Sequence, residues 1–166
     1  MSLMGPETTN LSISELDSLI SHMINYSTYD PSTGTVDDII NSGKLNIIQN
    51  KALKINISNW SGMFNDVKKD IQIANDHAFS LLLGFLNDKV NLKNVAIPKD
   101  ITEPTQMNIE GQSHFPTNYD ALMQDMEFEN LVHFHALNLI YLNREYIQIK
   151  GYLEENLELL EGEIHN

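Results

Sequence analysis

The chain has 166 residues, no cysteine, and 23 acidic against 10 basic residues, which gives a formal net charge of −13 at pH 7. A nucleic-acid-binding surface needs basic residues to displace phosphate counterions, and an anionic membrane repels an acidic protein, so this balance argues against both partners. Without cysteine the chain has no disulfide, no thiolate nucleophile and no cysteine-ligated zinc. Its length and its hydrophobic content of 42% predict one globular domain, residues 1–166.

The first ten residues carry no targeting signal. They lack the basic and then apolar segments of a signal peptide, and no run of 18 apolar residues follows that could span a membrane. The letters MSL ahead of Met4 look like a cloning remnant. We therefore expect residues 1–10 to be disordered or a cloning remnant, and we leave the first three out of the fold prediction.

Two helices are predicted before residue 50. Residues 13–26 place six apolar side chains on one face, with Ser12 or Ser14 available as the N-cap. A turn follows at residues 28–35. Residues 36–44 then predict a short helix, with Thr35 as its cap and Gly43 as the left-handed residue at its end.

A long helix is predicted over residues 50–90, because apolar residues recur there at steps of three or four. The apolar positions are Leu53, Ile57, Trp60, Phe64, Val67, Ile71, Ala74, Ala78, Leu81 and Phe85. Gly62 and Gly84 weaken this helix by at most about 1 kcal/mol each. At roughly 60 Å, a helix of this length can bury its apolar face only in a bundle or coiled coil.

Residues 91–118 hold three of the five prolines and no sustained period, and a connection of this length is uncommon in a compact domain. One interpretation is a lid or binding loop. The other, which we favour, is an extended connection that runs back along a long bundle.

The last predicted helix covers residues 125–164, and its apolar line is close to a heptad repeat. The line passes through Phe128, Leu131, His135, Asn138, Leu142, Glu145 or Tyr146, Ile149, Leu153, Leu157, Leu160 and Ile164. The sequence thus predicts an all-α bundle in which two long antiparallel helices, about 50–90 and 125–164, pack with an N-terminal helix and short helices.

His133 and His135 raise the question of a metal site, since they flank a single phenylalanine. On a helix, residues two apart point about 200° apart, so these two histidines cannot bind one ion. A weaker possibility is a site between helices that uses His22, His77 and His135 with Asp70 or Glu129. The favoured interpretation is a neutral core histidine that bonds Asn138 or a tyrosine hydroxyl.

Other candidate groups are few. Arg144 could clamp an anionic ligand or form an ion pair, and Asp66 with Asp70 could bind a cation or lie on a solvated face beside Lys69. The chain contains no nucleophile elbow, phosphate loop or dinucleotide fingerprint, so no catalytic residue and no cofactor is predicted. The candidate ligand-binding residues are His77, His135, Asn138 and Arg144.

Two stretches, residues 33–60 and 126–164, resemble conserved blocks of an uncharacterised family of membrane-anchored Bacteroidetes proteins. In the first block a short helix ends and the next begins through Ser42, Gly43, Lys44, Leu45, Ile47, Ile48 and Asn50. The second block is similar to the closing helix of that family. Together the blocks cover about 40% of the chain and carry no catalytic residue.

The resemblance implies a basic stretch and one transmembrane helix ahead of the helical domain, neither of which is in this sequence. By the positive-inside rule, the domain would then lie on the periplasmic side. The family has no known activity. The leading hypothesis is therefore a non-catalytic domain that binds a protein partner, associates with itself or relays a signal, and the alternative is a bundle that binds a small ligand or metal.

Overall fold

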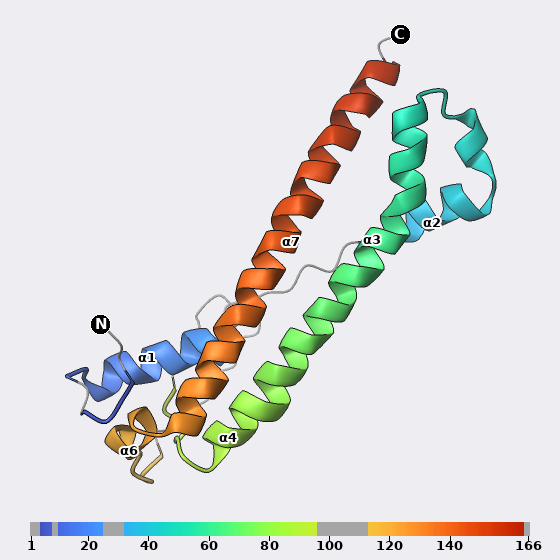
Figure 1. Ribbon diagram of the computed structural model, residues 1–166. Coiled ribbons are helices and arrows are strands. Elements are labelled where there is room, and N and C mark those ends of the chain that lie inside the picture. Colours follow the sequence, from blue (N-terminus) through green and yellow to red (C-terminus); the bar gives the residue numbers. More distant parts are fainter. Residues whose placement is uncertain (1–3, 8–9, 25–31, 96–112, 165–166) are drawn as a thin grey trace. The chain divides into compact units, whose positions relative to one another are not determined.

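The computed structural model describes residues 4–7, 10–24, 32–95 and 113–164, and all regular structure within these ranges is helical (Figure 1). This confirms the predicted all-α class. No helix among these residues is long and apolar enough to cross a membrane. The elements are α1 (Ile13–Ile24), α2 (Gly34–Asn41), the 3-10 helix η1 (Lys44–Ile47), α3 (Lys51–Asp76), the π-helix η2 (His77–Leu82), α4 (Leu83–Asn87), α6 (Tyr119–Met123) and α7 (Met126–Ile164).

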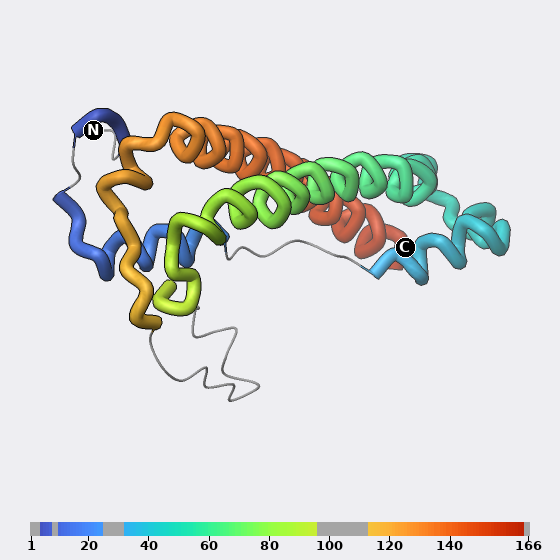
Figure 2. Tube along the Cα trace, turned by 90° about the horizontal axis from the view of Figure 1, so that it is seen from below, coloured from blue at the N-terminus to red at the C-terminus, as the bar shows by residue number. Residues whose placement is uncertain are grey.

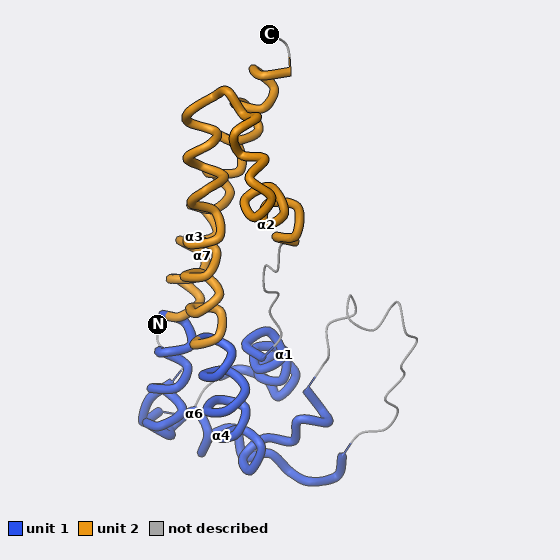
Figure 3. The backbone as a smooth tube through the Cα atoms, turned by 90° about the vertical axis from the view of Figure 1, so that its right-hand side faces the viewer, with its two compact units in different colours: residues 1–27, 74–137 blue, residues 28–73, 138–166 orange. Residues whose placement is uncertain are grey.

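The chain divides into two compact units (Figure 3). Unit 1 holds residues 1–27 and 74–137, and unit 2 holds residues 28–73 and 138–166. The long helices α3 and α7 both contribute residues to each unit. In unit 1, Phe85 stacks on Phe128 and the earlier His77 stacks on the later His135. In unit 2, Asp70 lies beside Glu145 and the earlier Asn56 contacts the later Tyr152. The predicted antiparallel pairing is therefore confirmed in both units.

Unit 1 is built around an apolar core between α1, η2, α4, α6 and the first turns of α7. Its buried members are Leu16, Ile20, Leu82, Leu86, Val90, Val95, Tyr119, Leu122, Met123 and Phe128. Ser12 caps α1: its hydroxyl accepts from the Glu15 amide at 3.3 Å, and the Glu15 carboxylate accepts from the Ser12 amide at 2.8 Å. This reciprocal capping box is what the sequence S-x-x-E predicts, and it selects Ser12 over Ser14.

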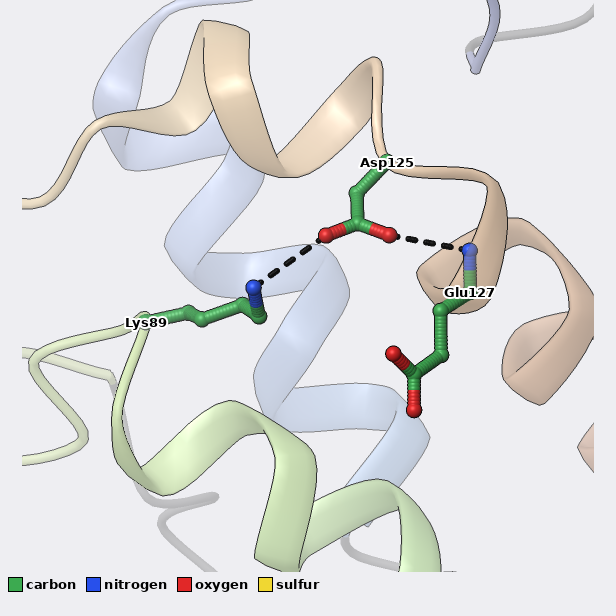
Figure 4. Close-up of polar contacts among 3 residues, drawn as sticks. All are labelled: Lys89, Asp125 and Glu127. Atoms are coloured by element: carbon green, nitrogen blue, oxygen red, sulfur yellow. Dashed lines mark hydrogen bonds and ion pairs between the residues drawn. The ribbon is translucent and has the colours of Figure 1, made fainter.

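Asp125 caps the N-terminus of α7 and links it to Lys89, just after the end of α4 (Figure 4). One carboxylate oxygen accepts from the Glu127 amide at 2.9 Å, and the other lies 3.1 Å from the Lys89 ammonium. The hydrogen bond from Lys89 lowers the pKa of Asp125 below its usual value. The Lys89 ammonium also lies 4.6 Å from the centre of the Phe85 ring, so one lysine holds a charge pair and a cation–π contact.

The two ends of the connection between α4 and α6 are joined by hydrogen bonds (Figure 2). The Asn94 side chain donates to the Ser113 carbonyl at 3.3 Å and accepts from the Ser113 amide at 2.8 Å. The Asn91 amide donates to the Thr117 hydroxyl at 3.0 Å. The predicted course along the bundle falls on residues 96–112, which lie outside the described residues, as do residues 1–3 and 8–9 of the predicted disordered start. Residues 4–7 of that start are placed against unit 1: Met4 packs on its core, and the Gly5 amide donates to the Met123 carbonyl at 3.0 Å.

Unit 2 packs α2 and the first part of α3 against the second part of α7. Its core comprises Trp60, Phe64, Val67 and Ile149. Asn50 caps α3 by accepting from the amides of Ala52 and Leu53. Gly43 adopts φ 72° at the end of α2, as predicted, but Thr33 rather than Thr35 is the N-cap of that helix.

The apolar line of α7 differs from the predicted one after Ile149. In unit 2 the inward positions are residues 142, 145, 149, 152, 156 and 159, an unbroken alternation of steps of three and four. The predicted continuation through Leu153, Leu157, Leu160 and Ile164 is wrong, since all four are exposed. Tyr152 occupies the inward position because its ring stacks on Trp60 and its hydroxyl donates to the Asn56 carbonyl.

The π-helix η2 accounts for the second departure from the predicted pattern. Leu81 and Phe85 were expected to be buried, but Leu82 and Leu86 are the fully buried residues. Leu81 is exposed, whereas Phe85 is half-buried and packs against the core of unit 1. A π-turn holds an extra residue compared with an α-helical turn, so the inward face moves along the sequence by one position. Gly62 and Gly84 remain helical, as predicted.

Candidate functional site

His77 and His135 lie together in unit 1, at the point where η2 packs against α7. Their rings are stacked at 6.1 Å between centroids and 12° between planes. His77 is the first residue of η2, and its Nε2 donates to the Leu131 carbonyl at 2.8 Å. The Nε2 of His135 donates to the Met23 carbonyl in the last turn of α1 at 2.9 Å. Each histidine therefore joins α7 to another helix.

His135 is a core residue, with 2% of its surface exposed. Burial lowers its pKa, the bond to the Met23 carbonyl opposes that shift, and the neighbouring His77 lowers the pKa further. The net lowering favours the neutral ring. The partner differs from the prediction: a backbone carbonyl at a helix C-terminus replaces the expected Asn138 or tyrosine hydroxyl. Such carbonyls have no partner within their own helix and accept readily from a side chain.

The three candidate metal ligands do not converge. His22 is exposed, and its Nδ1 lies 2.7 Å from the Ser18 carbonyl of its own helix. His77 and His135 direct their Nε2 atoms at carbonyls. Across residues 4–7, 10–24, 32–95 and 113–164, no group of three or more histidine or acidic side chains could hold an ion.

The other two candidate ligand-binding residues belong to unit 2. Asn138 is half-buried on α7, and Arg144 is exposed with no carboxylate of the described chain within ion-pair distance. An exposed guanidinium without a partner gives no evidence for an anion clamp. His133 is exposed, whereas His135 two residues later is buried, so the two histidines point in different directions, as predicted.

Glu145 and Asp70 are half-buried and lie close together in unit 2, with the exposed Asp66 nearby. Glu145 occupies an inward position of α7, and its buried Oε2 has no hydrogen-bond partner among the described residues. Burial raises the pKa of Glu145, and so do the hydrogen bond with Asp70 and the charges of Asp70 and Asp66. Two carboxyl groups can share a hydrogen bond only if one keeps its proton. Glu145 is therefore a weaker acid than an exposed glutamate, and its ionised form is destabilised at this position. Asp66 also pairs with Lys69 at 2.8 Å on the exposed face, as predicted.

Four apolar residues at the end of α7, here called the leucine strip, are exposed at helical spacing. Leu153, Leu157, Leu160 and Ile164 are 38%, 61%, 43% and 78% exposed. At about 100° per residue they fall within roughly 60° of arc, so they make one surface. Sequence patterns alone placed these residues in the core, because an apolar run at helical spacing is the same signal whether or not another helix covers it.

We expect His135→Ala to destabilise the protein by about 2–4 kcal/mol, because it leaves a cavity and a carbonyl of α1 without its donor. The matched control is His133→Ala, an exposed site on the same helix, which should change stability by less than about 0.5 kcal/mol. Urea denaturation at pH 7.5 measures both. Equal effects of the two substitutions would contradict the assignment.

The His135 contribution should also depend on pH. Because the folded pKa is lowered, the contribution is complete above the unfolded value of about 6.5 and decreases as the pH falls below it, since the unfolded state takes up the proton first. The stability difference between the native protein and His135→Ala should therefore narrow between pH 7.5 and pH 5. A difference that stays constant over this range would exclude a neutral, buried His135.

We expect Glu145→Gln to stabilise the protein by about 1 kcal/mol at pH 7.5, since the amide keeps a donor for Asp70 without a buried charge. Because the pKa of Glu145 is raised in the folded state, the contribution of Glu145 to stability is complete below the unfolded value of 4.5. It is lost as the pH rises through the folded pKa. The advantage of glutamine should therefore vanish at pH 4. Glu158→Gln, an exposed change of the same charge on α7, is the control; if both variants gained equally, relief of net charge would explain the result.

No family model and no curated protein matches the sequence, and no solved structure matches the fold. The structure and the comparisons thus support an all-helical domain and identify no family.

Proposed function

We propose that this chain is a non-catalytic helical domain that binds a protein partner, and that the leucine strip is the binding surface. The observation that carries the proposal is the exposure of Leu153, Leu157, Leu160 and Ile164 along one side of α7. The core of unit 2 does not use these side chains, because Ile149 and Tyr152 already fill the inward positions. Contiguous exposed apolar surface of this kind marks interaction sites.

The charges beside the strip favour a basic partner. Glu154, Glu158 and Glu161 follow its outer border at helical spacing, and Lys150 at the upstream end pairs with Glu154 at 3.7 Å. An apolar strip bordered by carboxylates is complementary to an amphipathic helix with apolar residues on one face and lysine or arginine beside them. A second copy of this chain would instead bring the same carboxylates together, and this opposes self-association through the strip.

We further propose that the domain lies on the periplasmic side of a membrane, carried by an anchor outside this sequence, and passes a binding signal to that anchor. This proposal is supported by the resemblance of residues 33–60 and 126–164 to the membrane-anchored family. Protease treatment of intact and permeabilised source cells tests it. Digestion only after the inner membrane is opened would refute the periplasmic placement.

The binding proposal is tested with a synthetic amphipathic helix that has leucine on one face and lysine on the other. We expect it to bind the native protein in a titration followed by fluorescence anisotropy, and added salt should weaken the binding. The double substitution Leu157→Ser with Leu160→Ser should reduce the affinity about tenfold or more, since it removes the central apolar contacts.

Ile140→Ser with Ile147→Ser is the matched control, because both isoleucines are 63% exposed on another side of the same helix. This variant should bind like the native protein. Equal binding of a peptide in which glutamate replaces every lysine would overturn the choice of a basic partner. A native dimer in light scattering that the leucine substitutions dissociate would show instead that a second copy covers the strip.

A further inference from the structure

Unit 1 contains a cavity of about 210 Å³ between α1, α6 and α7. Leu16 and Met23 of α1 line it, with Leu122 of α6, Phe128 and Val132 of α7, and Met4 from the N-terminal segment. The segment is held there by a hydrogen bond from the Gly5 amide to the Met123 carbonyl at 3.0 Å. The lining thus comes from four parts of the chain that fold together around one space.

The surface of this cavity is almost entirely carbon and sulfur. Tyr119 also lines the cavity, and its hydroxyl donates to the carboxylate of Asp17. A buried water needs two to four hydrogen-bond partners, which this wall does not supply, so a water molecule is not stabilised in the cavity. An empty cavity also forfeits the contacts its walls would otherwise make, and that loss grows with volume.

We propose that the cavity is a binding site for a small uncharged apolar molecule, such as a substituted benzene or a short hydrocarbon. An apolar protein cavity of about 150 Å³ stays dry and takes up benzene, and the present one is larger. A carboxylate or ammonium group on the ligand would be excluded, because the wall offers it no partner. Met4, Met23 and Met123 on the wall have flexible thioether chains that adjust to ligands of different shape.

Leu19 marks where a ligand enters. Its side chain lines the cavity and is nevertheless 42% exposed, so one side of the cavity reaches the surface beside α1. A molecule can therefore reach the interior by displacing Leu19 rather than by unfolding unit 1. This site is separate from the leucine strip of unit 2 and goes beyond the proposed function, so either can fail without the other.

The test uses the full chain with methyl-labelled methionine and titrates it with toluene, followed by NMR, with benzoate as the charged match of the same ring. We expect toluene to shift the methyl signals of Met4, Met23 and Met123 and to leave that of Met63 in unit 2 unchanged. At about ten times its Kd, toluene should raise the Tm by about 3 °C, and benzoate should have no effect.

Two substitutions make the outcome decisive. Val132→Phe places a larger side chain in the cavity and should abolish the toluene shifts while the circular dichroism stays helical. Leu19→Asp puts a charge at the entrance and should weaken toluene binding about tenfold, whereas Ile13→Asp, at an exposed site of α1 outside the lining, should not. Absence of methyl shifts in the native protein, or unchanged binding in a folded Val132→Phe, would overturn the proposal.

Discussion

The constraint on which the rest of the structure depends is the unbroken alternation of three- and four-residue steps along the inner face of α7. A helix of 39 residues with one apolar face is stable only if another element covers that face. In unit 2 the cover is α3, and in unit 1 it is α1, η2 and α4. Two of the polar residues at inward positions make contacts with other helices: His135 donates to the Met23 carbonyl at the end of α1, and Glu145 lies beside Asp70 of α3.

The sequence was sufficient to predict α1, α2, the two long helical segments and their antiparallel order, because spacing and capping residues act locally. The short elements η1 and α6 were not predicted at their positions. Ser12, Gly43 and Asn50 mark element ends through interactions with their own neighbours in sequence. The prediction of which side of a helix faces inward was wrong where contacts with another helix determine that side. Tyr152 faces inward because its ring stacks on Trp60 and its hydroxyl donates to the Asn56 carbonyl. The extra residue of η2 cannot be recognised from the spacing of apolar residues.

The same distinction applies to the candidate sites. That His133 and His135 face different ways follows from helical geometry alone, whereas the choice of the Met23 carbonyl as partner depends on where α1 ends. The cavity of unit 1 could not be predicted from the sequence, since it is a space left between four segments that are far apart along the chain. Exposure of the leucine strip likewise depends on the absence of a covering helix among the described residues, and a local pattern cannot report that.

The Asn94 side chain makes both hydrogen bonds to the backbone of Ser113, one as a donor and one as an acceptor. An amide group can do this because it carries a carbonyl oxygen and an NH2 group side by side. The segment that leaves α4 and the segment that leads into α6 are thus held together by a single side chain at this point. An aspartate at position 94 could accept from the Ser113 amide but could not donate to its carbonyl, so asparagine is the residue that this junction requires.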